Sequence, residues 1–360
     1  MFRDQRVHVV IPAYNVAGHI GAVLRGLPGF VDAVTVVDDG STDGTAEAAK
    51  SVGDRRVTLL QSPANEGVGG AMVRGFRHAL ARGEGIVVKM DGDGQMDPAD
   101  LARLLEPIAD GRCEYAKGNR FLMSRELDLM PKARLAGNFV LTFLTKLASG
   151  YWNVFDPQNG YLAIASRTLG LLDLDRLSRR YFFENDMLIN LNIFDARVRD
   201  VAMPSRYGGE RSSMRLGRIL CSFPYHLFRG YWYRFYRKHV LRDFSPVALF
   251  MLTGVPLLAW GTGFGAYTWA QSWLRNQFAS TGTVMVSVLP FLVGFELVLQ
   301  ALVLEIRDTP REDRGDGRVL PAFDGVKAGP VEASGCLGPG AFGHLSPPRR
   351  RRESGTEPDA

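Results

Sequence analysis

The amino-acid sequence predicts an α/β domain with a mostly parallel sheet, followed by a membrane-interface region and two transmembrane helices. Three observations carry this prediction. Short apolar runs alternate with amphipathic stretches, basic and aromatic residues then interleave, and two long apolar segments follow. The averages alone (360 residues, 46% hydrophobic, 22% charged, net charge +5) would describe an ordinary soluble protein.

Residues 1–205 are predicted to form the α/β domain. Short runs rich in β-branched residues indicate strands buried on both faces, at Val7–Ile11, Ala33–Val37, Val57–Leu60 and Gly85–Met90. Helix-like segments lie between or after them, at about 18–27, 42–51, 69–81 and 98–109. In parallel sheets, ligands bind beyond the carboxyl ends of the strands, so the loops that follow the strands should carry the chemistry.

Residues 206–245 carry nine Lys or Arg and two acids, a net +7 that exceeds the charge of the whole chain. A basic, aromatic stretch can bind nucleic acid, lie in a membrane interface, or be a solvated helix with its rings on the core. The segments that follow favour the membrane interface. We therefore expect no nucleic-acid partner, and we expect this stretch to meet an anionic lipid.

Two apolar segments predict transmembrane helices within residues 246–305. Phe244–Leu274 has no charged residue, and Thr283–Leu304 has Glu296 alone. Each exceeds the roughly 20 residues that cross a bilayer core. Lys and Arg before the first segment and after the second predict that the first domain and both termini are cytoplasmic. The alternative is that the two segments form buried helices of a soluble core. Glu296 is either functional or near enough the end of the second segment to reach the membrane interface.

Residues 306–360 contain sixteen Pro and Gly and predict a disordered tail. The tail includes the basic run Arg349–Arg352, which could touch anionic lipid or be a solvated cluster. The three cysteines lie far apart without metal-ligand spacing, which predicts a reducing compartment and no zinc site. The first apolar run is too short for a signal peptide.

Two acidic loops follow predicted strands. Asp38 and Asp39 precede a Gly-Ser turn and a helix start. Their carboxylates could accept hydrogen bonds from a nucleobase or ribose, or they could belong only to the turn. Asp91 and Asp93, two apart across Gly92, can direct both carboxylates at one hard cation, although ordinary turns contain the same pattern.

Together these loops resemble those of the family 2 glycosyltransferases, whose catalytic domain has the GT-A fold and would here span residues 1–205. Four motifs stand in the family's order, at Ile11–Asn15, Val37–Thr45, Asn65–Ala71 and Asp91–Pro98. The two C-terminal spans make the chain similar to the polyprenyl-phosphate branch, which includes dolichyl-phosphate mannosyltransferases and undecaprenyl-phosphate sugar transferases. Val16 departs from the Glu that many members carry, which leaves the base preference open.

The resemblance implies three sets of site residues. The nucleotide pocket would be lined by Pro12, Tyr14, Asp39 and Asp91, with Asp38 beside them. Mg²⁺ or Mn²⁺ and the donor diphosphate would be held by Asp91, Asp93 and Gln95. The acceptor phosphate would be bound by Arg120, Arg134, Arg211 and Ser212, and the catalytic set would be Asp156, Arg120, Arg134 and Arg211.

Structural roles remain open for several of these positions. Arg120 and Arg134 could be surface arginines, and Asp156 could brace a loop. The acids Glu184 and Asp186 either belong to a helix start or approach the acceptor. The glycine loop at residues 67–70 either receives an anion or allows close packing.

The predicted reaction is a metal-dependent, inverting transfer of a sugar from a GDP- or UDP-sugar to a polyprenyl phosphate at the cytoplasmic face. A phosphate monoester is largely ionised near neutral pH, so the acceptor needs no strong general base. The alternatives are a membrane-bound family 2 enzyme that extends a glycan or glycolipid hydroxyl, and an inactive nucleotide-sugar-binding scaffold. Relatives with two spans also suggest a homo-oligomer. No motif identifies the sugar.

Overall fold

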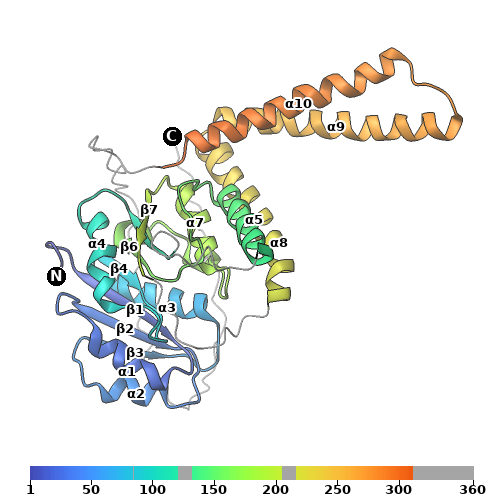
Figure 1. The fold of residues 1–360 in the computed structure, drawn as a ribbon. Helices are drawn as coiled ribbons and strands as arrows, with labels where there is room; N and C mark the ends of the chain where they lie inside the picture. Colours follow the sequence, from blue (N-terminus) through green and yellow to red (C-terminus); the bar gives the residue numbers. More distant parts are fainter. Residues whose placement is uncertain (84, 121–131, 205–215, 311–360) are drawn as a thin grey trace, which may run out of the picture. The chain divides into compact units, whose positions relative to one another are not determined.

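The computed structural model describes residues 1–83, 85–120, 132–204 and 216–310 (Figure 1). Within these residues one seven-stranded sheet has the order β3-β2-β1-β4-β6-β5-β7. The strands are β1 (Val7–Ala13), β2 (Ala33–Asp38), β3 (Val57–Gln61), β4 (Ile86–Lys89), β5 (Tyr115–Asn119), β6 (Leu162–Ala165) and β7 (Val198–Ala202). The first four strands lie where the apolar runs predicted them.

The sheet is mostly parallel, as predicted, with one reversal. Strands β3, β2, β1 and β4 are parallel, whereas β6 runs antiparallel to both β4 and β5. Leu162, the first residue of β6, pairs with Lys89, the last residue of β4. The reversal therefore brings the chain just before β6 to the edge where the parallel strands end.

Helices cover both faces of the sheet (Figure 1). In the first domain they are α1 (Ala17–Gly26), α2 (Thr45–Ser51), α3 (Val68–Ala81), α4 (Leu101–Ala109), α5 (Lys132–Ser149), α6 (Ser166–Leu169) and α7 (Phe183–Ile193), with short 3₁₀ turns at Pro98–Asp100 and Leu174–Arg176. One core joins the sheet to α1 and α4, and a second joins it to α3 and α7. A Cβ at Gly75 would lie 2.2 Å from Val10 Cγ1, so glycine is what lets α3 approach β1 closely.

The second half of the chain continues as helix α8 (Leu216–Phe235), the π-helical segment η4 (Tyr236–Arg242), and helices α9 (Pro246–Arg275) and α10 (Thr281–Arg307). Helices α9 and α10 are long and apolar enough to cross a membrane by length and composition. They pack side by side (Figure 1). Glycines lie in the contact between them. A Cβ at Gly261 would lie 2.5 Å from the backbone nitrogen of Phe291, and such contacts are typical of paired transmembrane helices.

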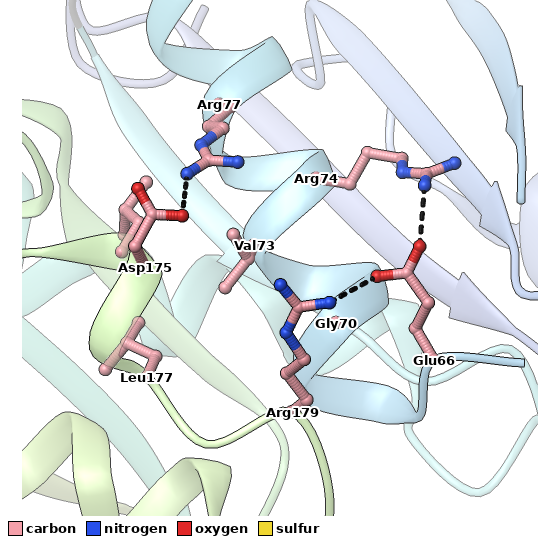
Figure 2. Close-up of a pocket in the computed structure, with 9 residues that line it drawn as sticks. Glu66, Gly70, Val73, Arg74, Arg77, Asp175, Leu177 and Arg179 are labelled. Atoms are coloured by element: carbon pink, nitrogen blue, oxygen red, sulfur yellow. Dashed lines mark hydrogen bonds and ion pairs between the residues drawn. The ribbon is translucent and has the colours of Figure 1, made fainter.

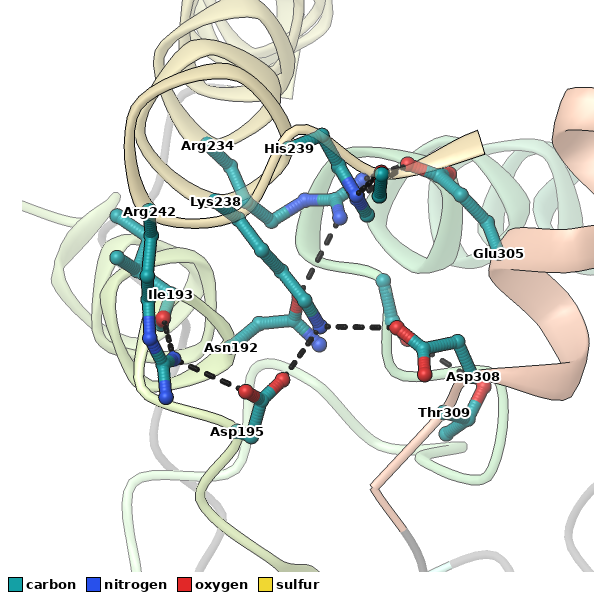
Figure 3. Close-up of polar contacts among 12 residues, drawn as sticks. Asn192, Ile193, Asp195, Arg234, Lys238, His239, Arg242, Glu305, Asp308 and Thr309 are labelled. Atoms are coloured by element: carbon teal, nitrogen blue, oxygen red, sulfur yellow. Dashed lines mark hydrogen bonds and ion pairs between the residues drawn. The ribbon is translucent and has the colours of Figure 1, made fainter. Parts of the chain in front are cut away.

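A buried polar junction ties the end of α10 to α5 and α8 (Figure 3). Arg234 Nη2 lies 3.0 Å from Glu305 Oε1, and both side chains are almost fully buried. The same guanidinium donates from Nε to the carbonyl of Ala148, the residue before the last of α5. Because a buried charge is stable only when it is paired and hydrogen-bonded, this junction fixes how these helices meet.

The beginning of the predicted disordered tail is ordered. Helix α10 continues to Arg307, and the buried Thr309 hydroxyl lies 3.5 Å from the carbonyl of Gly150. Residues 311–360, the rest of that predicted tail, lie outside the described residues.

We expect Arg234→Met to destabilise the protein, because it leaves Glu305 buried without its cation. Breaking a buried pair from one side typically costs about 3–5 kcal/mol, which corresponds to a fall in the unfolding midpoint on the order of 10 °C. Calorimetry in detergent measures this midpoint. The matched control is Arg237→Met, the same change at an exposed position three residues away. Equal midpoints for the two variants would contradict the structural role of the pair.

Stability should also depend on pH through His8. Its Nε2 lies 2.7 Å from Thr35 Oγ1, which also contacts His78 Nδ1. Burial, assisted by His78 and Arg82, lowers the pKa of His8 from 6.5 to about 4. Between pH 6.5 and 4 the unfolded chain therefore binds a proton at His8 that the folded chain does not bind. The contribution of His8 to the free energy of unfolding is fully present above about pH 6.5 and is lost as the pH falls towards 4.

The free energy of unfolding lost through protonation of His8 amounts to about 3 kcal/mol. In His8→Gln the unfolding midpoint should fall less steeply between pH 6.5 and 4.5 than in the parent protein. His19→Gln, at an exposed position, should keep the parental slope. If His8→Gln also keeps that slope, the buried histidine is not the group responsible.

Candidate active site

The candidate site lies along the edge where β1, β2 and β4 end. Ala13 is paired with Asp38 across β1 and β2, and Val10 is paired with Lys89 across β1 and β4. The loops that leave these neighbouring strands therefore start side by side. They carry Tyr14, Asp39 and Asp91, as the parallel arrangement predicted.

The loops after β1 and β2 are fastened to each other. The side chain of Asn15 accepts a hydrogen bond of 3.0 Å from the backbone N–H of Thr42, and the N–H of Asn15 donates to Ser41 Oγ. Asn15 itself has a left-handed backbone, with φ of 53°, a conformation that asparagine tolerates better than most residues. Tyr14, beside it, is half-exposed at this edge, and Pro12 is the next-to-last residue of β1.

Asp38 and Asp39 are buried and already hold the surrounding loops. Asp39 accepts from the backbone N–H groups of Glu66 and Gly67, at 2.9 and 2.8 Å. Asp38 accepts from the N–H of Ser41 at 3.0 Å. Each carboxylate oxygen has two lone pairs, so these bonds shape the pocket without excluding a nucleotide. Their predicted contact with the nucleotide stays a prediction.

The glycine segment at residues 67–70, which forms the start of α3, serves close packing. A Cβ at Gly69 would lie 2.0 Å from the carbonyl oxygen of Ser178. The N–H of Gly70 donates to the carbonyl of Arg179, and that of Gly67 donates to Asp39. Because these amides have protein partners, the structure favours packing over anion binding here.

A pocket lies beside this glycine segment, between α3 and the segment that precedes α7 (Figure 2). Its basic side chains are already paired. Arg74 and Arg179 both contact Glu66, at 2.8 and 3.1 Å, and Arg77 contacts Asp175. The pocket is therefore lined by surface ion pairs, and Glu66, which takes part in two of them, also donates its backbone N–H to Asp39.

Asp91 and Asp93 form the acidic turn after β4. Asp91 is partly exposed, and Asp93 Oδ1 accepts the backbone N–H of Gln95 at 3.0 Å. Among the described residues no group of three or more His, Cys, Asp or Glu is gathered around a common point. Two carboxylates nevertheless fit Mg²⁺ or Mn²⁺, because such ions are commonly held by one or two carboxylates together with substrate phosphates. A bound diphosphate would supply the remaining oxygen ligands.

Lys89 is a site residue that the sequence analysis missed. Its ammonium is fully buried and has three acceptors, Asp91 Oδ1 at 2.7 Å, the carbonyl of Gly160 at 3.2 Å and Glu184 Oε1 at 3.3 Å. Burial alone would lower the pKa of Lys89, but the charges of Asp91 and Glu184 outweigh it and raise the pKa. A lysine at the end of an otherwise apolar strand was the signal that could have found it.

Gly160 allows this arrangement. A Cβ there would lie 2.4 Å from Lys89 Nζ and 2.7 Å from Asp91 Oδ2. A side chain at this point would displace one of these groups, so glycine leaves room for the contact between Lys89 and Asp91.

Arg120 and Asp156 form a bidentate pair beside the turn. Arg120 Nε lies 2.9 Å from Asp156 Oδ2, and its Nη2 lies 3.1 Å from Oδ1. Asp156 is 2% exposed, whereas the arginine side chain is 40% exposed. The structure shows that Asp156 braces Arg120, and its predicted catalytic role stays a prediction. Beneath it, burial lowers the pKa of Lys117 to about 8, although the nearby acids Asp156, Glu184 and Asp200 oppose the shift.

The two acids at the start of α7 point to different places. Glu184 faces Lys89, whereas Asp186 accepts the backbone N–H of Ser178 at 2.8 Å. Burial raises the pKa of Asp186 to about 6. Only Glu184 therefore joins the site.

Three predicted phosphate-binding residues cannot be placed. Arg134 belongs to α5, but its side chain is not among those that the structure describes. Arg211 and Ser212 lie outside the described residues.

Comparisons with known proteins identify the family. Residues 8–168 match glycosyl transferase family 2. The chain is 31% identical to the UDP-N-acetylglucosamine–dolichyl-phosphate N-acetylglucosaminyltransferase of Methanococcus voltae, over 55% of this chain and 86% of that one. It is 32% identical to the undecaprenyl-phosphate mannosyltransferase of Micrococcus luteus, over 54% and 82%.

A solved structure of glucosyl-3-phosphoglycerate synthase from Mycobacterium tuberculosis, in complex with UDP, is 23% identical with a TM-score of 0.48, over 63% of this chain and 80% of that one. The family match and the curated relatives agree with the four sequence motifs. The chain therefore belongs to glycosyl transferase family 2 and is a glycosyltransferase, similar to the branch of that family named for polyprenyl-phosphate acceptors.

Proposed function

We propose that this glycosyltransferase moves a sugar from a nucleoside-diphosphate sugar to a polyprenyl phosphate at the cytoplasmic face of a membrane. The observation that carries the proposal is the meeting, at one sheet edge, of the acidic turn at Asp91 and Asp93 with the braced Arg120. The named relatives act on dolichyl and undecaprenyl phosphates, which supports the same acceptor class here.

The proposed chemistry is mainly positioning. Asp91 and Asp93, with Gln95, would hold Mg²⁺ or Mn²⁺, which would neutralise the departing diphosphate. Arg120, oriented by Asp156, would direct an acceptor phosphate oxygen at the anomeric carbon. That oxygen forms the new bond to carbon while the bond to the diphosphate breaks, with inversion. The acceptor is already ionised, so no carboxylate needs to remove a proton.

Exposed aromatic side chains support contact with a membrane. Helices α5 and α8 pack against each other, and both carry large apolar residues in the open. These include Phe139 and Phe143 on α5 and Tyr225, Phe228 and Trp232 on α8. Aromatic side chains of this kind favour the bilayer interface. We propose that these two helices lie on the membrane that α9 and α10 cross.

The transfer reaction can be tested with purified full-length protein, undecaprenyl or dolichyl phosphate, and a panel of labelled GDP- and UDP-sugars. We expect a mild-acid-labile glycolipid and free nucleoside diphosphate with one donor. Label on a saccharide or glycolipid hydroxyl would instead support an enzyme that extends glycans. Nucleotide binding without turnover with any donor would support the inactive scaffold.

Asp93→Asn should lower transfer about 100-fold or more, since a bound metal contributes several kcal/mol to stabilising transition-state charge. Asp97→Asn is the matched control. It makes the same change in the same loop, at a residue whose carboxylate caps the next turn by accepting from the N–H of Ala99. Full activity of the parent protein in the presence of a chelator, with no metal added, would contradict the metal assignment.

Lys89→Met should weaken metal use, because Lys89 holds the Asp91 carboxylate in place. Loss of a group that orients a metal ligand typically costs about 10- to 100-fold in metal affinity or activity. We therefore expect the Mn²⁺ concentration for half-maximal nucleotide binding to rise by that factor.

Lys117→Met is the matched control for Lys89→Met. Lys117 is equally buried and pairs with Leu162 from the other side, but its ammonium donates to the carbonyl of Asn159. Both variants should unfold at lower temperature, but only Lys89→Met should change the Mn²⁺ requirement. An equal change in both would mean that the loss of a buried charge, and not the hold on Asp91, is responsible.

A further inference from the structure

Asp200 lies in the middle of β7, which is the edge strand beside β5. The parallel pairing of these strands places Asp200 opposite Lys117, two residues before Asn119, the last residue of β5. The residue that follows is Arg120, which would bind the acceptor phosphate in the proposed function. Asp200 therefore lies near the point where the chain leaves β5 for the candidate site.

One oxygen of the Asp200 carboxylate accepts hydrogen bonds from two segments of the chain. Asn119 Nδ2 donates to Asp200 Oδ2 at 2.6 Å, and the backbone N–H of Phe155 donates to the same oxygen at 2.8 Å. Asn119 immediately precedes Arg120, and Phe155 immediately precedes Asp156. A single oxygen thus fastens the residue before each member of the Arg120–Asp156 pair.

The other oxygen of Asp200 contributes no hydrogen bond to the fold. Oδ1 is buried and has no hydrogen-bond partner among the described residues. Burial also raises the pKa of Asp200, although the bonds from Phe155 and Asn119 and the charge of Lys117 oppose the rise. A buried polar atom without a partner is unfavourable, so the carboxylate is not explained by its own surroundings. What accounts for it is the pair of groups that Oδ2 holds.

The Arg120–Asp156 pair transmits any movement between the two fastened segments. Asp156 accepts from the Arg120 side chain at 2.9 and 3.1 Å, and the backbone N–H of Arg120 lies 3.3 Å from Asp156 Oδ2. The guanidinium therefore follows the Asp156 carboxylate, which in turn follows the backbone at Phe155. When a group must direct a reacting atom, a misplacement of about 1 Å can cost about 100-fold in rate.

We propose that Asp200 is a positioning residue for the acceptor phosphate. By holding Asn119 and Phe155 on one oxygen, it sets the orientation in which Arg120 meets the phosphate. Asp200 acts through Arg120 and does not itself contact the substrate. The inference rests on the proposed function, in which Arg120 directs the phosphate of a polyprenyl phosphate at the anomeric carbon of the donor sugar.

Steady-state kinetics of the purified full chain separate positioning from a general loss of structure. In Asp200→Ala we expect the KM for undecaprenyl or dolichyl phosphate to rise about tenfold or more, because the acceptor phosphate is held less well. The KM for the nucleotide sugar and the Mn²⁺ requirement should keep their parental values. A smaller folded fraction would instead lower kcat and leave both KM values unchanged. A parental acceptor KM in Asp200→Ala would overturn the proposal.

Two further variants serve as controls in the same assay. Asp200→Asn should restore an acceptor KM near the parental value, since its amide oxygen can take the place of Oδ2 and its nitrogen that of the unpartnered Oδ1. Glu114→Ala removes another carboxylate, which is buried before the opposite end of β5 and accepts the backbone N–H of Arg197 at 2.7 Å. It should lower the unfolding midpoint and keep the parental acceptor KM.

Either control can contradict the proposal. If Asp200→Asn raises the acceptor KM as much as Asp200→Ala does, the hydrogen bonds to Oδ2 are not what positions Arg120. If Glu114→Ala raises it equally, the effect follows from the loss of any buried carboxylate and not from the position of Asp200.

Arg120→Lys tests whether Asp200 acts through Arg120. Lysine keeps a positive charge but cannot make the bidentate contact with Asp156, so the acceptor KM should rise while activity stays measurable. Adding Asp200→Ala to this variant should raise the acceptor KM no further, because residues that act through one another are not additive. Two rises that multiply in the double variant would overturn the proposal.

Failure of the proposed function gives a different result. The parent chain would then transfer no sugar to either polyprenyl phosphate, or Arg120→Lys would keep the parental acceptor KM, and the role of Asp200 would be overturned together with that function. If the parent and Arg120→Lys behave as proposed and Asp200→Ala keeps the parental acceptor KM, only the role of Asp200 is wrong.

Discussion

The buried ammonium of Lys89 is the interaction on which the site geometry depends. A charge inside a protein core is tolerated only when it is paired and hydrogen-bonded, and this one has three acceptors from three parts of the chain. It holds Asp91 after β4, Gly160 before β6 and Glu184 at the head of α7. These three segments therefore cannot move independently without exposing an unpaired charge. The acidic turn is held in place by the core beneath it.

The reversal of β6 explains why this link exists. In an all-parallel sheet the start of a strand lies at the edge opposite to the site. Because β6 runs antiparallel to β4, its start at Leu162 lies beside the end of β4. The preceding segment, with Asp156 and Gly160, is thereby brought to the edge that carries the candidate site. The reversed strand thus supplies both the brace for Arg120 and the glycine that fits between Lys89 and Asp91.

The sequence predicted the features that depend on local pattern. Strands β1 to β4 follow from runs of β-branched residues, and the acidic turns follow from their place after those runs. It did not predict β5 to β7 or the tie at Lys89, because these depend on pairings between segments about 45 residues or more apart. Residue type was also insufficient for Asp39 and Asp156. Their main partners, two backbone amides and an arginine, are visible only once the chain is folded.

The role of the charges in the basic stretch at residues 206–245 was also not visible from the sequence alone. Its excess of +7 suggested a surface for lipid phosphate, yet part of that charge is used inside the protein (Figure 3). Arg234 pairs with Glu305, Lys238 Nζ lies 2.7 Å from Asp195 Oδ1, and Arg242 contacts the same Asp195. A cation already paired with a protein carboxylate attracts lipid phosphate less. The stretch therefore joins α8 to the catalytic domain and to α10 first, and its remaining charges are those that can meet a membrane.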